Sequence, residues 1–416
     1  MAANTPPSTS PVRTPERALQ NVTPDSVTPS TGGRIAALDV LRGLAIIGTL
    51  ASNIWIFTTP GGPAEWISGG GFATADPAQR VLQTLANGKF LGLLTLLFGV
   101  GLELQYRSMV RRGMPWPGRY ALRAGILFVE GLVHYILVFE FDVLMGYAIA
   151  SLLAAYLIGR SDRVVRAWGG VLAGLFVVAI AGATALMVAT GGSVAASAGG
   201  GGAQAADPAV LSTGSWFDQV LLRLEYVALF RIELILIVPS ATVLFLVGSR
   251  LVRAGLFTTT EDAARLRRRL AWVGLGAGVP LNALTAWAGP DWFLVDRYLV
   301  PPLVAVGILA LGTTLVARAK TSGGLLRRGV EGVGRTALSC YVLQNVLASV
   351  LCYDWGFGLA GGGPWQVMAL WAGISLTLMV LAPLWLRRWP RGPIELLMHR
   401  VYDARRRLSS ASHSAR

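Results

Sequence analysis

One apolar run of the chain carries five ionisable side chains, and their types and spacing suit proton-transfer chemistry. In RAGILFVEGLVHYILVFEFD, residues 123–142, these are Arg123, Glu130, His134, Glu140 and Asp142. A charged side chain at bilayer depth costs at least ~2.5–3.5 kcal/mol on insertion scales, so such groups persist where they pair or carry out a function. This run is therefore the first candidate for an active or transport site.

Glu130 and His134 are four residues apart and share a helical face with Arg123. A carboxylate beside a histidine fixes the imidazole tautomer and raises its basicity, which is the arrangement of a general base. We predict that His134 and Glu130 are a catalytic pair nearer the outer leaflet, with Glu140 and Asp142 capping the outer turn. The alternative is that Glu130 and His134 are a structural pair that bonds helices to one another.

Two basic residues near the predicted membrane edges are candidates for binding anionic groups. Arg42 follows Asp39 by three residues, one turn inside the cytoplasmic edge of the first apolar run. The two side chains either neutralise each other, or Arg42 contacts an anionic head group or a donor phosphate. Lys89 lies near the outer end of the second run and either snorkels to head groups or stabilises an oxyanion close to His134.

A polar stripe marks the segment GRTALSCYVLQNVL near the C-terminus. Positions 341, 344 and 345 share a helical face, which is expected to point into the protein and either bind substrate or bond neighbouring helices. No metal-ligand spacing occurs in the sequence. The candidates for binding substrate or donor, all of them polar residues inside or at the edge of apolar runs, are Asp39, Arg42, Asn53, Lys89, Arg123, Asp142, Arg335, Tyr341 and Gln344.

Composition predicts that membrane-spanning helices position these residues. The chain has 416 residues, 53% hydrophobic and 14% charged, whereas an ordinary soluble domain is about a quarter charged. The sequence therefore predicts an all-α polytopic membrane helix bundle of about ten spans. Windows of about 20 apolar residues place these spans near 36–58, 84–105, 119–138, 142–159, 167–189, 231–250, 270–288, 296–317, 335–353 and 365–386.

The positive charge predicts the orientation of the bundle. The formal net charge is +14, and the basic residues gather in the tails and in the connections that follow even-numbered spans, such as RSMVRRGMPWPGR and RLRRRL. Short loops with this bias stay in the cytoplasm, so both termini are expected inside. The implied partners are anionic lipid head groups on the cytoplasmic side and not nucleic acid. The oligomeric state is not predicted.

The rest of the chain divides by composition. Residues 1–33 are rich in Pro, Ser and Thr and are expected to be a disordered cytoplasmic tail. Residues 34–390 are the predicted transmembrane domain, and 391–416 a basic cytoplasmic tail. A flexible linker is expected at 191–208, followed by an interfacial helix over 216–231.

The sixth predicted span contains a proline, and the ninth contains two cysteines. The Val-Pro-Ser at 238–240 is expected to break the sixth span and open a cavity. Cys340 and Cys352 lie twelve residues apart in one predicted helix, about 18 Å along its axis, so they cannot form a disulfide with each other.

Several motifs resemble a known family. RIAALDVLRGLAIIGTLASNIWIF, GKFLGLLTLLFGVGLELQ, RAGILFVEGLVHYILVFEFDVLMGYAIASLL, GRTALSCYVLQNVL and RGPIELLMHRVYD together resemble the YeiB-like family of bacterial inner-membrane proteins, which carries the domain of unknown function 418. The resemblance extends over roughly residues 34–403. It implies a multi-pass protein of the bacterial cytoplasmic (inner) membrane, and no particular reaction comes with it.

A second, more distant resemblance concerns the first span. LDVLRG is similar to the LDGLRG that opens integral-membrane acyltransferases of the OafA type, which move acyl groups from cytoplasmic donors to sugars. In those enzymes a histidine follows about ten residues beyond the Arg-Gly, and counting from Arg42 that position holds Asn53. Because an amide cannot act as a general base, the base of such an enzyme must come from elsewhere in this chain.

Two functions of different classes fit these residues. In the first, a cytoplasmic acyl-CoA docks on the Arg-rich loops as co-substrate, and His134, with Glu130 behind it, activates a hydroxyl of an extracytoplasmic or lipid-linked acceptor. No bound cofactor is expected. In the second, Glu130, His134 and Asp142 relay protons in a transporter or exporter of a small or lipid-linked metabolite. A structural or accessory role is the third alternative.

Overall fold

A computed structural model describes residues 36–60, 62, 66, 76–118, 120–190, 214–319 and 324–401 of the chain. Every regular element in these ranges is a helix, which confirms the all-α prediction. The tail predicted for residues 1–33 and the linker predicted for 191–208 lie outside the described residues.

The helices correspond one by one to the ten predicted spans. Eight segments are long and apolar enough to cross a bilayer, and the fourth and ninth spans are the shorter apolar helices α6 and α17. The protein is therefore a polytopic membrane protein. The spans are α1 (Ala36–Phe57), α3 (Pro77–Ala86) with α4 (Lys89–Arg111), α5 (Tyr120–Leu137), α6 (Leu144–Ile158), α7 (Asp162–Ala189), α11 (Val227–Arg231) with α12 (Leu234–Arg253), α13 (Glu261–Ala271) with η2 (Trp272–Ala277) and α14 (Gly278–Trp287), η3 (Pro290–Trp292) and η4 (Val295–Leu299) with α15 (Pro301–Arg318), α17 (Ala337–Cys352) and α18 (Pro364–Leu386).

Three shorter helices lie outside these spans. They are α10 (Trp216–Glu225), α16 (Leu325–Arg335) and a helix over residues 393–401. Together α10 and α11 bear out the helical prediction for 216–231. The helix over 393–401 lies within the segment expected to be a basic tail.

The second span is two helices rather than one, and Gly88 explains the break. Asp76 starts α3 by accepting hydrogen bonds from the N–H groups of Ala78 and Gln79, 2.8 and 3.2 Å away. At the junction with α4, Gly88 has φ +66°, and a Cβ there would lie 2.3 Å from the carbonyl oxygen of Arg297. Both the backbone angle and the close approach therefore require glycine.

Two further predictions about helix boundaries were wrong. Arg335 does not belong to the ninth span, because it ends α16, and Thr336 (φ −118°, ψ 37°) separates α16 from α17. Pro239 does not break the sixth span, because it lies in the second turn of α12 and the helix continues to Arg253. A proline so close to a helix start removes few intrahelical hydrogen bonds.

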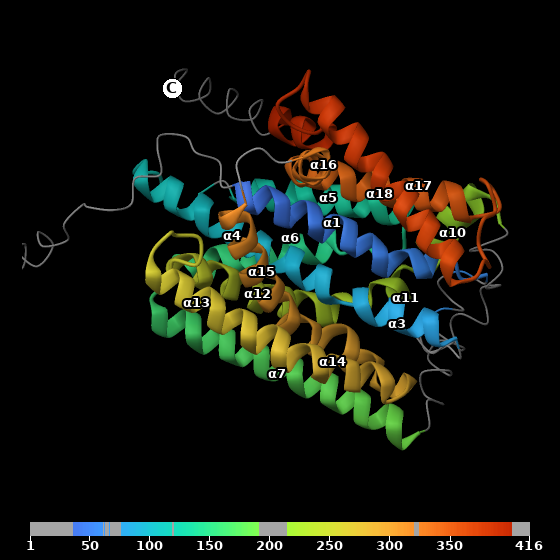
Figure 1. Cartoon of the computed structure of the whole chain (residues 1–416), viewed down its shortest axis with the longest axis horizontal. Coiled ribbons are helices and arrows are strands. Elements are labelled where there is room, and N and C mark those ends of the chain that lie inside the picture. The colour runs from blue at the N-terminus through green and yellow to red at the C-terminus, as the bar shows by residue number, and fades with distance from the viewer. Residues whose placement is uncertain are drawn as a thin grey trace, which may run out of the picture. The chain divides into compact units, whose positions relative to one another are not determined.

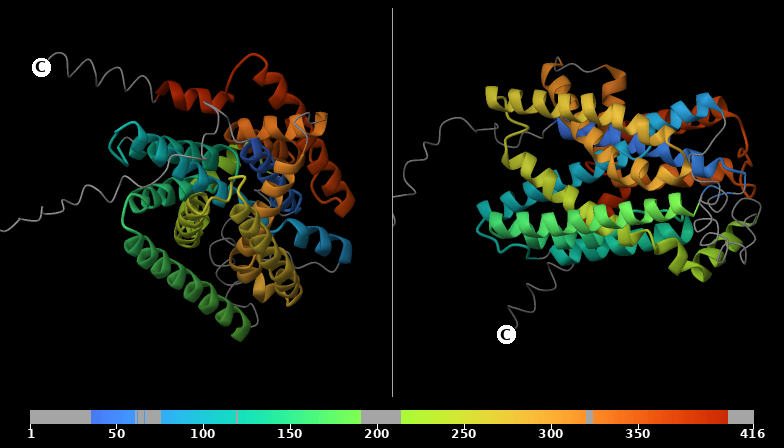
Figure 2. Two further views of the ribbon diagram at one scale, coloured as in Figure 1. Left: turned by 60° about the vertical axis from the view of Figure 1, so that its left-hand side comes forward. Right: turned by 90° about the horizontal axis from the view of Figure 1, so that it is seen from below.

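The first helix lies at the centre of the packing, and α7 lies at an edge. In the apolar window of α1, 72% of the residues are buried, whereas the value for α7 is 17%. α1 packs against α4, α15, α16 and α17, and in Figure 1 α16 is seen nearly along its axis while α1 runs across the view. Figures 1 and 2 show α7, coloured green, at one edge of the bundle.

A glycine permits the closest contact of α1. A Cβ at Gly334, near the end of α16, would lie 1.7 Å from the backbone oxygen of Asp39 in the first turn of α1. No side chain fits in that space, so the two backbones touch. The N-terminal and C-terminal parts of the chain are thus packed directly on each other.

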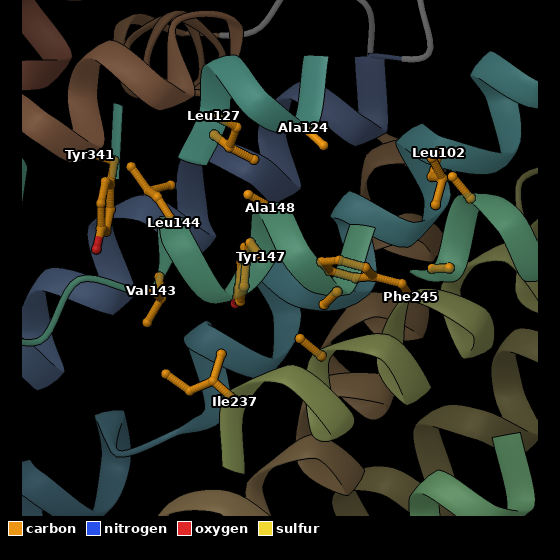
Figure 3. Packing of buried hydrophobic residues seen from close by; sticks show 14 of the residues in the cluster. Leu102, Ala124, Leu127, Val143, Leu144, Tyr147, Ala148, Ile237, Phe245 and Tyr341 are labelled. Carbon is orange, nitrogen blue, oxygen red and sulfur yellow. The ribbon is translucent and has the colours of Figure 1, made fainter. Parts of the chain in front are cut away.

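One hydrophobic cluster joins helices from both halves of the chain. It includes Ile46 of α1, Leu102 of α4, Tyr147 of α6, Phe245 of α12 and Tyr341 of α17. Figure 3 shows Tyr147 in the middle of the cluster, with Phe245 beside it and Tyr341 and Leu102 toward opposite sides of the view. Because the cluster draws on residues before and after position 250, the two halves share one core.

Polar contacts join the C-terminal parts of three even-numbered spans. Glu103, near the C-terminal end of α4, accepts hydrogen bonds from Arg253 (3.1 Å), Arg107 (2.9 Å) and the Ser249 hydroxyl (2.7 Å). Arg253 also donates to the carbonyl of Ile158, the last residue of α6, at 2.9 Å. The ends of α4, α6 and α12 therefore meet at one side, as even-numbered spans should.

Candidate functional site

His134, in the last turn of α5, is buried between a carboxylate and an amide. Its Nδ1 lies 3.0 Å from Oδ1 of Asp142, and its Nε2 lies 3.2 Å from Nδ2 of Asn345 on α17. Only 2% of His134 and 1% of Asp142 are exposed. Because a carboxylate only accepts, Nδ1–H donates to Asp142, and Nε2 is left to accept from the Asn345 amide.

The predicted pairing of His134 with Glu130 was wrong. Both ring nitrogens of His134 are occupied by Asp142 and Asn345, and both carboxylate oxygens of Glu130 are buried without a hydrogen-bond partner in the described residues. Side chains at i and i+4 share a helical face, but the chain turns after α5 and brings Asp142 closer to the imidazole. The imidazole is therefore oriented by Asp142 and not by Glu130.

Asp142 is held in place from several directions. Its Oδ2 accepts from the N–H of Met145 at 3.2 Å, so the same carboxylate orients His134 and bonds the first turn of α6. Its backbone oxygen accepts from Arg231 at 3.0 Å. A Cβ at Gly131 would lie 2.8 Å from Oδ2, so α5 passes close to the carboxylate at that glycine.

Arg231 and Arg223 fix the segment that carries Asp142. The Arg231 guanidinium lies 4.1 Å from the centre of the Tyr135 ring and also donates to the backbone oxygen of Glu140. Arg223 pairs with the Glu140 carboxylate at 2.8 Å. Glu140 and Asp142 were expected to cap the outer turn. In the structure, Glu140 instead pairs with Arg223, and Asp142 hydrogen bonds to His134.

The polar stripe of α17 points into the protein, as predicted. The Tyr341 ring centre is 5.3 Å from that of His134, and Asn345 bonds the imidazole. Gln344 is fully buried, and neither atom of its amide has a hydrogen-bond partner in the part of the chain that the structure describes. The same is true of Oδ1 of Asn345. The stripe thus bonds helices through Asn345 and leaves several polar atoms to be satisfied by other groups.

None of the other predicted binding residues hydrogen bonds to the imidazole, whose nitrogens bond Asp142 and Asn345. Asp39 and Arg42 form the expected pair, 3.7 Å apart, near the start of α1. Arg123 is exposed and donates to Gln105 at 3.2 Å. Asn53 is buried in α1. The face predicted to carry Arg123, Glu130 and His134 therefore does not make one site.

Lys89 belongs to a separate buried cluster. Its ammonium donates to the backbone oxygen of Thr84, and only 7% of the residue is exposed, so it does not snorkel to head groups. Next to it, Asn87 donates to Asp296 at 2.6 Å and accepts from Arg297 at 3.2 Å. Two more donors complete the carboxylate's partners, Asn282 at 2.7 Å and Thr285 at 3.2 Å. Lys89 is thus held by this cluster and not by His134.

A small cavity lies beside the Asp142 segment. It encloses about 40 Å³ between α4, α6, α12 and α15, and its lining includes Val143, Tyr147, Thr95 and Ser240. The hydroxyl groups of Tyr147 and Thr95 are hydrogen bonded to each other. This volume is enough for a few water molecules.

Comparisons with known proteins reveal similar chains. Residues 251–405 match the family described as protein of unknown function, DUF418. The uncharacterized protein YxaH of Bacillus subtilis (strain 168) is 25% identical over 398 residues, covering 88% of this chain and 94% of that protein. The uncharacterized protein YeiB of Escherichia coli (strain K12) is 26% identical over 391 residues, covering 88% and 96%. The chain is thus similar over most of its length to YxaH and YeiB, and its C-terminal region matches DUF418. No solved structure matches it significantly.

The DUF418 match divides the site between two regions. Residues 251–405 include Tyr341, Gln344 and Asn345 of α17 but neither His134 nor Asp142. The imidazole and its carboxylate come from the preceding part of the chain. In this protein, the site is therefore complete only when both regions are packed together.

Sequence reasoning missed three features of the site. The sequence shows Asp142 only as an acidic residue eight positions after His134, and nothing in the sequence marks it as the partner of the histidine. The contact of Asn345 with His134 spans 211 residues of sequence, and the contact of Arg231 with Asp142 spans 89. No local pattern in the sequence signals either of them.

Proposed function

We propose that this protein is an acyltransferase of the bacterial cytoplasmic membrane in which His134 is the general base. The observation that carries the proposal is the buried Asp142–His134 pair, with Nδ1 held by a carboxylate and Nε2 left as an acceptor. This is the arrangement that general-base catalysis requires. The resemblance of LDVLRG, at the start of α1, to membrane acyltransferases supplies the reaction class.

In the proposed reaction, an acceptor hydroxyl replaces the Asn345 amide at Nε2 of His134. His134 removes the hydroxyl proton while the oxygen attacks the thioester carbonyl of an acyl-CoA. The new C–O ester bond forms, the C–S bond breaks, and the coenzyme A thiolate leaves. Asp142 holds the imidazole in the correct tautomer and stabilises the imidazolium that forms.

The proposal also accounts for Asn53. In the acyltransferases that LDVLRG resembles, a histidine stands at this position of the first span, and here the side chain is an amide in α1. His134 of α5 would provide the base that Asn53 cannot. Arg42, whose side chain is 31% exposed, lies near the cytoplasmic start of the same helix and would contact the donor phosphates.

One observation favours a second candidate function, proton-coupled transport. Glu130 is a buried carboxylate without a hydrogen-bond partner in the described residues. Carboxylates of this kind in membrane interiors mark proton and ion pathways. Under this alternative, labelled substrate would cross the membrane unchanged and no acyl-CoA would be consumed.

The test measures acyl transfer from labelled acyl-CoA by purified protein in lipid nanodiscs. Asp142→Asn is the informative variant, because it keeps the size of the side chain but removes the charge that fixes the imidazole tautomer. Its matched control is Asp296→Asn, which changes an equally buried carboxylate in the separate Lys89 cluster. We expect His134→Gln and Asp142→Asn to lower the transfer rate ~10²–10⁴-fold and the control to retain activity per folded molecule.

Two results would contradict the proposal. Equal losses in Asp142→Asn and Asp296→Asn, in parallel with lower melting temperatures, would assign the Asp142–His134 pair to stability. Wild-type protein that transfers no acyl group from any of a panel of acyl-CoA donors would remove the enzyme reading and leave the transport alternative.

A further inference from the structure

A buried carboxylate lies between the Asp142–His134 pair and the cytoplasmic end of the bundle. Glu130 precedes His134 by four residues on α5, so it lies about 6 Å nearer the cytoplasmic end of that helix. Both of its carboxylate oxygens are buried without a hydrogen-bond partner in the described ranges. An unpartnered buried carboxylate is costly, and native proteins satisfy such groups with water or a ligand.

On its outer side, Glu130 is close to Asp142. The Asp142 carboxylate lies against Gly131, the residue that follows Glu130, where a Cβ would be 2.8 Å from Oδ2. The two carboxylates interact electrostatically. A proton held on the Asp142–His134 pair therefore has a second buried carboxylate within electrostatic range.

On its cytoplasmic side, Glu130 interacts with Glu395. Glu395 belongs to the helix over 393–401 and caps α17, because its Oε1 accepts from the N–H groups of Leu338 and Ser339 at 2.9 and 3.3 Å. Ser339 precedes Asn345 by six residues, about 9 Å along α17. Glu130 thus lies at a depth between Glu395 and His134, within electrostatic range of carboxylates on both sides.

The facing part of α17 supplies further polar atoms without protein partners. They are both atoms of the Gln344 amide and Oδ1 of Asn345. Buried amides of this kind are normally bonded to ordered water when no protein group reaches them. Together with Glu130, they form a set of buried polar groups on α5 and α17, called here the polar seam, that water would satisfy.

We infer that Glu130 relays protons along this seam between His134 and the cytoplasmic side. The inference rests on the proposed acyl transfer and explains a requirement of that reaction. His134 takes the hydroxyl proton in the outer half of the protein, where the C–S bond breaks, and the coenzyme A thiolate then leaves toward the cytoplasmic side while the proton stays on the imidazolium. The proton passes from the imidazolium to the Glu130 carboxylate, then through water past Glu395, and ends on the thiolate sulfur as coenzyme A thiol.

The first test measures hydration of the seam and needs no enzymatic activity. Cys340 and Cys352 are replaced by Ala, and Glu130→Cys is then exposed to a membrane-impermeant thiosulfonate reagent from the cytoplasmic side. The matched control is Val129→Cys, the neighbouring residue of α5, which is 59% exposed on the lipid-facing surface. We expect modification at position 130 and none at 129. An unreactive Cys at 130 would overturn the inference.

The second test measures proton transfer during turnover. Glu130→Gln removes the proton-carrying group at nearly constant size, and Glu130→Asp keeps it. We expect Glu130→Gln to slow transfer about tenfold or more and to enlarge the solvent deuterium isotope effect, because proton movement then limits the rate. Glu130→Asp should restore most of the rate.

The outcomes separate the inference from the proposed function. If wild-type protein transfers acyl groups and His134→Gln abolishes transfer, while Glu130→Gln keeps the wild-type rate and isotope effect, the acyltransferase stands and the relay is wrong. If wild-type protein transfers no acyl group, the proposed function fails, and the relay from His134 to a thiolate fails with it, even where position 130 is modified.

Discussion

Arg223 of α10 donates from Nε to Oε1 of Glu140 across 2.8 Å, and both side chains are buried. Arg223 also donates to the backbone oxygens of Ile136 and Val138, at 3.2 and 3.3 Å. A short helix ahead of the sixth span is thereby bonded to the segment that carries Asp142. The position of the His134 partner depends on an arginine about eighty residues further along the chain.

We predict that Arg223→Met destabilises the protein by about 3–5 kcal/mol, because it leaves the Glu140 carboxylate buried without its cation. The double variant Arg223→Met with Glu140→Leu should recover much of the loss, since neither charge then remains. Thermal unfolding in detergent measures both. A double variant no more stable than Arg223→Met would show that the contacts of Arg223 with backbone oxygens matter more than the ion pair.

The Glu395 cap predicts a local effect on α17. Replacing Glu395 by Ala removes the acceptor for the N–H groups of Leu338 and Ser339, and losing an N-terminal cap costs about 0.5–2 kcal/mol. We expect faster amide hydrogen exchange in the first turn of α17 and unchanged exchange in α7. Exchange that rises equally in both helices would indicate global unfolding instead of a lost cap.

Two glycine substitutions should have opposite effects. Gly88→Ala forces a side chain into a position with φ +66° and only 2.3 Å from the Arg297 carbonyl oxygen, so it should lower the melting temperature clearly. Gly182→Ala in α7 meets no atom within 4 Å and should be neutral or stabilise by about 0.5–1 kcal/mol. Equal melting temperatures for the two variants would refute the structural role given to Gly88.

The predicted orientation can be tested on either side of the sixth span. In a protein with Cys340 and Cys352 replaced by Ala, Gly214→Cys should react with an impermeant thiol reagent from outside the cell, and Thr259→Cys only after the membrane is opened. The reason is that α11 and α12 separate the two positions, and the basic connection after α12 is expected in the cytoplasm. Reaction of both from the same side would refute the topology.

The capping box of α10 gives a pH dependence. The hydroxyl and N–H groups of Ser215 both donate to Asp218, at 2.6 and 3.0 Å, and hold the pKa of that carboxyl below its usual range. Because the folded pKa is the lower one, the stabilisation is present above about pH 4 and is lost as the pH falls through the folded value. Hydrogen exchange of α10 between pH 6 and 3 should show this loss, and Ser215→Ala, which keeps only the backbone N–H donor, should reduce the pH dependence.

The sequence predicts the helices well and the helix breaks poorly. A span needs only a run of apolar residues, which is a local property, so each of the ten windows corresponds to helix in the structure. The break at Gly88 depends on the approach of Arg297, more than 200 residues away in sequence. The predicted ninth span begins at 335, within two residues of the start of α17, but the sequence did not reveal the separate helix α16 that ends at Arg335.

The site, too, was predicted only where it depends on local sequence and not where it depends on contacts between distant segments. Helical spacing correctly placed Tyr341, Gln344 and Asn345 on an interior face, because that depends on one helix. The same rule paired His134 with Glu130, although the turn after α5 brings Asp142 to the imidazole. Lys89 was expected either at the head groups or close to His134, and its actual burial depends on a cluster assembled around Asp296 from three separate segments.

The contact between Asp39 and Gly334 has a consequence for how the protein is made. α1 emerges from the ribosome first, and the backbone it packs against is translated almost 300 residues later, about 15–60 s at bacterial elongation rates. During that interval α1 is in the membrane, and the face that will contact α16 has not yet met its final neighbour. The pairing of Asp39 with Arg42, three residues apart in the same helix, needs no other helix to form, so it neutralises both charges from the moment α1 is inserted.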